Sequence, residues 1–232
     1  STGKLSRLRL DLDRTEAVLD GLPLAVFTRN TGVPGSALLL SGPVNDVEIS
    51  VDGVALPRID AEAVQVPWEF TRRGQLPLHV SRAGHPFELR SSAFFETGIA
   101  PQLAYLDGSG ALKAAHEDFH GLVTVDDAAV AGSVIHTWMF GLGALDRPLA
   151  TGEPGPRNPV AKPVAPMACY LRGLTGEPPA VGLEVPFVAY APGLIGAYQV
   201  DLRIPANWPA GFSTVICEAG RRAVNATLPV RR

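Results

Sequence analysis

The chain consists of short apolar runs separated by glycine and proline, and most runs show the period of a strand. Between residues 7 and 13, leucines alternate with arginines and aspartates. Because successive side chains of a strand point to opposite faces, this alternation places the leucines on one face and the charges on the other. It predicts a half-exposed strand there. We expect one helical turn or a loop over residues 15–21 and another strand over residues 24–28.

Two stretches of the chain carry the same landmarks in the same order. The phrase V-x-G-S occurs at residues 33–36 and 130–133, and an apolar run follows it both times. The later pairs are predicted strands at 47–53 and 167–173, 64–67 and 202–205, 76–81 and 214–218, and 87–94 and 223–230, with Trp68 and Trp208 at matching places. This order indicates an internal duplication of one β unit. Each copy is long enough to bury its own core between two antiparallel sheets.

The repeat divides the chain into an N-terminal sandwich over residues 1–97 and a C-terminal sandwich over 130–232. Residues 98–129 are predicted to form a connecting hairpin or linker that packs with the second domain. An Asp-Gly-Ser-Gly turn at 107–110 favours the hairpin, and a helix over 111–120 is the alternative. The proline-rich segment 141–166 is expected to be a long extended loop, since proline removes the donors of a strand ladder.

Composition excludes several classes of protein. Glycine and proline number 24 and 21, which is typical of many turns between many strands. The formal net charge is −3, with no basic stripe, so we expect no nucleic-acid partner. No apolar run reaches the about 18 residues that span a bilayer, so no transmembrane segment is expected. The opening S-T-G-K-L is not a signal peptide and is typical of a mature or trimmed start.

The sharpest chemical motif is His-Glu-x-x-His at residues 116–120. On a helix, His116 and His120 would lie one turn apart and could bind Zn²⁺, with Glu117 polarising a water molecule. The Gly and third His of the extended zinc-protease motif are missing, and the surroundings are predicted to be β. We therefore interpret the motif as a turn or strand end and assign no catalytic residue, no cofactor and no metal ligand.

Aromatic residues offer a second candidate site. Five of them could form a platform that stacks against sugars, or they could pack in the core and at strand edges. They are Trp68, Trp138, Trp208, Tyr190 and Tyr198. Both interpretations stay open, although the matching places of the first and third favour a repeated structural role.

The two cysteines, Cys169 and Cys217, lie 48 residues apart on strands that could face each other across one sandwich. A disulfide between them is one possibility, and two free thiols are the other. A bridge closing this loop would stabilise the fold by about 3 to 4 kcal/mol in the loop-entropy estimate. The first copy has no cysteine at the matching strands, so the bridge is not essential to the fold.

Several phrases resemble the uncharacterised C-terminal domain family found in secreted proteins of Acidobacteria of the Solibacter type. The specific part covers residues 130–230, and a looser part reaches back to residue 33. The phrases are G-S-V-I-H at 132–136, F-G-L-G-A at 140–144, A-T-G-E-P at 150–154 and Y-A-P-G-L-I-G-A-Y-Q-V at 190–200, with V-P-W-E at 66–69 upstream. The resemblance implies export, an immunoglobulin-like β fold and a place at the C-terminal end of a larger or cell-surface protein. It implies no activity.

We therefore expect an all-β protein of two tandem immunoglobulin-like antiparallel β-sandwich domains. The expected function is that of a non-enzymatic, secreted or cell-surface module for display, adhesion or protein interaction. A carbohydrate-binding module that uses exposed aromatics is the alternative, and a zinc-dependent hydrolase is a third. The expected partner is a protein or a polysaccharide, and the expected state is a monomer.

Overall fold

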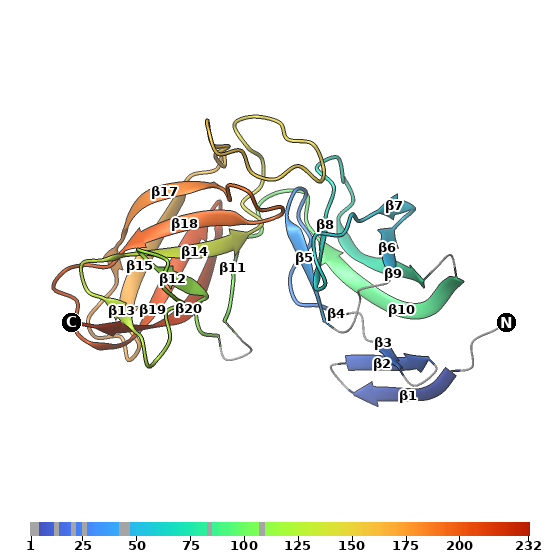
Figure 1. Ribbon diagram of the computed structural model, residues 1–232, viewed down its shortest axis with the longest axis horizontal. Coiled ribbons are helices and arrows are strands. Elements are labelled where there is room, and N and C mark those ends of the chain that lie inside the picture. Colours follow the sequence, from blue (N-terminus) through green and yellow to red (C-terminus); the bar gives the residue numbers. More distant parts are fainter. Residues whose placement is uncertain are drawn as a thin grey trace. The chain divides into compact units, whose positions relative to one another are not determined.

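The computed structural model describes residues 5–11, 14–19, 22–24, 27–41, 47–82, 85–106 and 110–232 (Figure 1). Every regular element within these ranges is a β-strand, and the strands pair antiparallel apart from one short parallel pair and a few isolated bridges. The predicted all-β class is confirmed. Within the same ranges, no helix is long and apolar enough to cross a membrane.

The chain divides into two compact units. Unit 1 contains Ser1–Gly98 and Leu149–Glu153, and unit 2 contains Ile99–Pro148 and Pro154–Arg232. Most of the proline-rich segment therefore belongs to unit 2, but five of its residues belong to unit 1. No strand forms between residues 141 and 166, as the prolines predicted.

Unit 2 is a sandwich of two sheets (Figure 1). The first sheet has the order β11 (Gln102–Leu103), β14 (Val134–Phe140), β18 (Tyr198–Arg203) and β17 (Glu184–Tyr190), with β12 (Ala114–His116) also paired to β14. The second has the order β13 (Ala129–Val130), β20 (Arg222–Arg231), β19 (Gly211–Ala219), β15 (Met167–Gly173) and β16 (Val181–Gly182).

This order is the immunoglobulin arrangement. With β14, β15, β17, β18, β19 and β20 taken as strands B to G, one sheet contains B, E and D and the other contains G, F and C. The inner faces close on each other because alternate side chains are apolar. Ile135 and Leu202 from the first sheet are fully buried, as are Val215 and Leu228 from the second.

Unit 1 repeats the arrangement on a smaller scale. Its sheets have the orders β4 (Phe27–Thr28), β5 (Ala37–Ser41), β8 (Ala63–Gln65) and β10 (His85–Phe95), β9 (Gly74–Arg82), β6 (Glu48–Val51), β7 (Val54–Ala55). They enclose a core that includes Leu38, Val64, Leu78 and Phe95. A separate three-stranded sheet forms from β1 (Leu5–Asp11), β2 (Arg14–Leu19) and β3 (Leu22–Leu24).

Equivalent backbone hydrogen bonds join the two copies of the V-x-G-S phrase to the strand that ends in Pro. In unit 1 the Gly35 N–H donates to the Val66 carbonyl at 2.8 Å, and in unit 2 the Gly132 N–H donates to the Ile204 carbonyl at 3.0 Å. Both glycines have positive φ, 76° and 92°, a conformation that glycine adopts without steric cost. The strands therefore form two tandem immunoglobulin-like sandwiches, as predicted.

Some local predictions were wrong. Residues 14–19 form β2 where a helical turn or loop was expected, because pairing with β1 and β3 supplies their backbone partners. Of the strand expected over residues 24–28, Leu24 ends β3 and Phe27 and Thr28 form β4, while residues 25 and 26 lie outside the described residues. The alternative helix over 111–120 does not form, since Ala114 to His116 pair with β14. Most of the turn predicted at 107–110, like residues 12 and 13 of the first strand, lies outside the described residues.

Candidate functional site

The His-Glu-x-x-His motif lies on a tight turn in unit 2. β12 ends at His116, and the Phe119 N–H donates to the His116 carbonyl at 2.9 Å, which closes a β-turn. Phe119 has a φ of 58°, in the left-handed region. The His116 N–H donates to the Gly121 carbonyl at 3.1 Å, so the chain folds back on itself as a hairpin. The segment is therefore not helical, whereas the His-Glu-x-x-His motif of zinc proteases lies on a helix.

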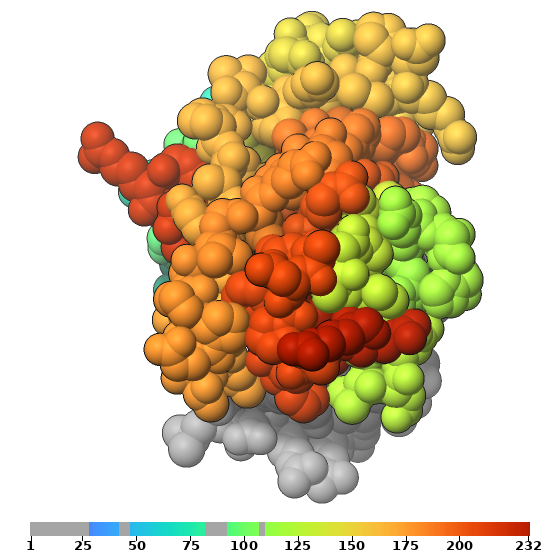
Figure 2. All heavy atoms as spheres, turned by 90° about the vertical axis from the view of Figure 1, so that its left-hand side faces the viewer, coloured from blue at the N-terminus to red at the C-terminus, as the bar shows by residue number. Residues whose placement is uncertain are grey.

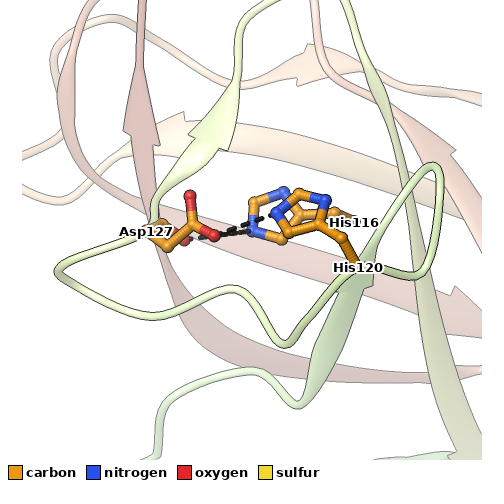
Figure 3. Close-up of side chains that lie close together, drawn as sticks. All are labelled: His116, His120 and Asp127. Atoms are coloured by element: carbon orange, nitrogen blue, oxygen red, sulfur yellow. Dashed lines mark hydrogen bonds and ion pairs between the residues drawn. The ribbon is translucent and has the colours of Figure 1, made fainter.

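The turn nevertheless brings the two histidines together with an aspartate from further along the chain (Figure 3). The Nε2 atoms of His116 and His120 lie 3.2 and 3.0 Å from Oδ2 of Asp127. The two imidazole rings stack, with centroids 4.3 Å apart. These three residues, called here the histidine cluster, each offer one ligand atom, and the three atoms lie within 4.8 Å of one another.

Neighbouring groups hold Asp127 in place. Its N–H donates to Thr124 Oγ1 at 3.1 Å, and the Thr124 N–H donates to the Asp127 carbonyl at 2.9 Å. Its second carboxylate oxygen, Oδ1, lies 3.7 Å from Nη2 of Arg231, near the C-terminal end of β20. Figure 2 shows this end of the chain, in dark red, against the green segment that carries the histidine cluster.

Charge pairing within the turn shifts three pKa values. The pKa of His120 is raised, first by its hydrogen bond to Asp118 and then by that to Asp127. The same bonds lower the pKa of both aspartates. Oδ1 of Asp118 also accepts the backbone N–H of His120 at 3.1 Å. The carboxylates are therefore held ionised next to an imidazole that favours its protonated form.

Glu117 faces away from the histidine pair. Its Oε2 accepts the N–H of Val134 at 3.2 Å, and its backbone carbonyl lies 3.1 Å from Nε2 of His136. The other ring nitrogen of His136 lies 2.8 Å from Oδ1 of Asp201, and the Phe119 ring stacks on the His136 ring at 4.0 Å. Glu117 thus anchors the turn to β14. In a zinc hydrolase this carboxylate would instead lie beside the metal-bound water.

The aromatic platform considered from the sequence does not form. Tyr190, Tyr198 and Trp208 are buried, and the two tyrosine rings meet edge to face at 5.4 Å. The Tyr198 hydroxyl donates to the Gly143 carbonyl, and burial raises the pKa of that hydroxyl. The Trp208 indole donates to Ser213 Oγ at 2.7 Å. The core interpretation holds for these three residues, while Trp68 and Trp138 are half-buried.

Cys169 and Cys217 form a disulfide, with an S–S distance of 2.01 Å. They lie on β15 and β19, which are neighbours in one sheet. The expectation that their strands face each other across the sandwich was wrong. The Cys169 carbonyl points away from β19 and accepts the N–H of Leu183. The two cysteines are therefore a non-hydrogen-bonded pair, the kind in which the Cα atoms of an antiparallel pair lie closest.

One sheet face of unit 2 carries exposed apolar side chains. On β19, Val215 and Cys217 point into the core, so Phe212 and Ile216 point outward. Phe212 lies opposite Pro229 of β20, and its carbonyl accepts the N–H of Leu174. Leu174 and Phe212 are 52% and 48% exposed. Ile216 lies between Tyr170 of β15 and Asn225 of β20.

We call this surface the outer face: it comprises Tyr170, Arg172, Leu174, Phe212, Thr214, Ile216, Glu218, Asn225, Thr227 and Pro229. It was not recognised in the sequence, although the period-two pattern of 211–219 carries the signal. Each cysteine marks an inward-facing position of its strand. The residues directly before and after each cysteine must therefore point to the solvent.

No family model matches the chain, and no curated protein matches it. Among solved structures, it is similar to the surface glycan-binding protein SGBP-B of a Bacteroides ovatus mixed-linkage glucan utilisation locus. The match has 11% identity and a TM-score of 0.40, and covers 89% of this chain and 45% of that one. The chain therefore spans less than half the length of this protein.

Two further similarities are to tandem domains. Titin immunoglobulin domains A164–A165 match with 13% identity and a TM-score of 0.27, covering 89% of this chain and 94% of that one. Domains 4 and 5 of the S-layer protein SbsC match with 12% identity and a TM-score of 0.23, covering 100% and 94%. TM-scores below 0.5 do not establish a shared fold, so the fold assignment rests on the strand order described above.

Proposed function

We propose that the chain is a non-enzymatic interaction module that is displayed outside the cell and binds a protein partner through the outer face. One observation carries the proposal: Phe212 of β19, Pro229 of β20 and Leu174, directly after β15, form an apolar row on a solvent-facing sheet surface. The solvated face of an antiparallel sheet is ordinarily polar. Contiguous apolar side chains there, with polar residues around them, are typical of a protein-binding surface.

The residues around the row favour a protein over a sugar as the ligand. Arg172 and Thr214 lie next to the row, and Tyr170 and Ile216 form a second apolar pair beyond them, followed by Glu218. An apolar centre with a polar rim is the usual anatomy of protein interfaces. Tyr190, Tyr198 and Trp208, by contrast, are buried and cannot take part in the sugar-stacking platform considered above.

Export is supported by the Cys169–Cys217 bridge, because disulfides persist mainly in oxidising compartments. The resemblance to the C-terminal domains of secreted acidobacterial proteins agrees with it, and membership of that family is part of the proposal. The non-enzymatic part of the proposal is supported by Glu117, whose carboxylate caps the Val134 N–H and is turned from the histidine pair.

The test compares the unaltered protein with a Leu174→Ser/Phe212→Ser double variant. Each protein is immobilised and exposed to the extracellular proteins of the source cells, and the retained proteins are quantified. Val164→Ser is the matched control, since Val164 is an exposed valine elsewhere in unit 2. We expect a protein that the unaltered chain and the control retain and the double variant loses. Equal retention by all three, or binding on a glycan array that the double variant keeps, would contradict the proposal.

A further inference from the structure

We propose that the histidine cluster binds a divalent transition-metal ion, with Zn²⁺ as the ion that the ligands fit best. The ligands are Nε2 of His116, Nε2 of His120 and Oδ2 of Asp127. This site is separate from the outer face and goes beyond the interaction function. Two imidazoles and one carboxylate are a ligand set that zinc uses in proteins.

Two of the three distances between the ligand atoms are close to those around a tetrahedral ion, and the third is at most 4.8 Å. Zinc binds nitrogen and oxygen ligands at about 2.0–2.2 Å, so tetrahedral ligands lie about 3.3–3.6 Å from each other. The two Nε2 atoms lie 3.2 and 3.0 Å from Oδ2 of Asp127. These short contacts join imidazole and carboxylate in the absence of an ion, so a bound ion would replace the protons on both nitrogens. The stacked rings would also have to rotate until both Nε2 lone pairs point at the ion, a side-chain movement that the exposed His120 can make.

A second shell of hydrogen bonds already orients the ligands. Nδ1 of His120 is bonded to Oδ1 of Asp118, which directs Nε2 of the same ring toward Asp127. This carboxylate–histidine pair is the arrangement that fixes the tautomer of metal-binding imidazoles in known sites. Asp127 is held by its two hydrogen bonds to Thr124. These hydrogen bonds hold His120 and Asp127 close together even without a bound ion.

Access and charge also suit a cation. His116 is buried and forms the floor of the site, while the His120 and Asp127 side chains are 50% and 42% exposed. A hydrated ion can thus enter from solvent and keep water in the remaining position. Asp118 and Asp127 contribute negative charge, and the guanidinium of Arg231 contacts Oδ1 of Asp127, leaving Oδ2 to the two histidines.

The experiment measures Zn²⁺ binding by isothermal titration calorimetry on chelator-treated protein that carries no polyhistidine tag. We expect saturable binding of one ion per chain below about 100 µM free zinc. His120→Gln and Asp127→Asn each remove a ligand, and we expect each to weaken the affinity at least tenfold. Asp118→Asn keeps all three ligands and should weaken it by about 10-fold or more through the second shell.

His79→Gln is the matched control, because His79 is an exposed histidine on β9 of unit 1. It should bind zinc as the unaltered protein does. His120 lies on an exposed turn, so its variant is expected to remain folded, and circular dichroism checks this. Added Co²⁺ should give the visible absorption of a four-coordinate ion. No saturable binding up to about 1 mM zinc, or unchanged affinity in both ligand variants, would overturn the proposal.

Discussion

Cys169 lies directly opposite Cys217 on neighbouring strands of one sheet, with Cα atoms 4.1 Å apart. Antibody domains place their disulfide between the two sheets, whereas this one joins strands C and F of the same sheet. It closes a loop that contains β16, β17 and β18. Because β16 belongs to one sheet and β17 and β18 to the other, the loop that the bridge closes contributes strands to both sheets of unit 2.

Removing the bridge should destabilise unit 2. We expect Cys169→Ala/Cys217→Ala to lower the free energy of unfolding by about 3 to 4 kcal/mol, because the unfolded chain regains the entropy of a 48-residue loop. Chemical denaturation followed by tryptophan fluorescence measures the change. The unaltered protein under reducing conditions should lose a similar amount. A loss below about 1 kcal/mol would show that the bridge contributes little.

Gly35 should tolerate no side chain. Its φ is 76°, and a Cβ atom there would lie 2.1 Å from the Trp68 ring. We expect Gly35→Ala to cost about 3 kcal/mol or more, from backbone strain and the clash together. Gly53 is the control, since it has a φ of 78° with open space around it, and its alanine variant should cost about 1 kcal/mol. Equal costs in thermal unfolding would show that the ring contact does not matter.

The buried hydroxyl of Tyr198 should contribute to the stability of unit 2. Replacing this residue with phenylalanine leaves the Gly143 carbonyl without its donor, and we expect a loss of about 1 to 2 kcal/mol. Tyr105 donates to the Asn225 carbonyl at the surface, so Tyr105→Phe should change stability by less than about 0.5 kcal/mol. Urea denaturation of the two variants makes the comparison. A smaller loss for Tyr198→Phe than for Tyr105→Phe would contradict the burial.

The pairing of His120 with Asp118 predicts a pH dependence in metal-free protein. The folded pKa of His120 is raised, so its stabilisation is fully present below the unfolded value of about 6.5 and is lost as the pH rises through the folded pKa. The pKa values of Asp118 and Asp127 are lowered. Their stabilisation is present above about pH 3.9 and is lost as the pH falls through the folded values.

Nuclear magnetic resonance of the imidazole nitrogens checks this pH dependence. The His120 pKa should lie above about 6.5 and should fall in Asp118→Asn. Thr124→Ser is the control, because it keeps the hydroxyl that orients Asp127. A His120 pKa that does not change in Asp118→Asn would show that the pair is not formed in solution.

The repeated scaffold could be predicted because its signals are local. The glycines of the two V-x-G-S phrases, Gly35 and Gly132, and the prolines after the later strands that pair with them, Pro67 and Pro205, stand at the same places in both copies. Strand order is not local, so the sequence placed Cys169 and Cys217 on facing strands when they are on adjacent ones.

The histidine cluster was missed for a related reason. The spacing of His116 and His120 has chemical meaning on a helix, and a β context argued against it. A left-handed residue at Phe119 folds the segment back and stacks the two rings. The third residue, Asp127, comes from a separate turn, and no spacing rule joins it to the other two. Only the tertiary fold of the segment after β12 brings them together.

The most direct measurement of the interaction proposal is the affinity of the outer face for the protein that the chain retains. Biolayer interferometry would compare the dissociation constant of the unaltered chain, Leu174→Ser/Phe212→Ser and Val164→Ser with that protein. Because an apolar residue at the centre of an interface contributes about 1 to 3 kcal/mol, the double variant should bind at least tenfold more weakly. Val164→Ser should bind as the unaltered chain does. Equal dissociation constants for all three proteins would contradict the claim that the outer face binds the partner.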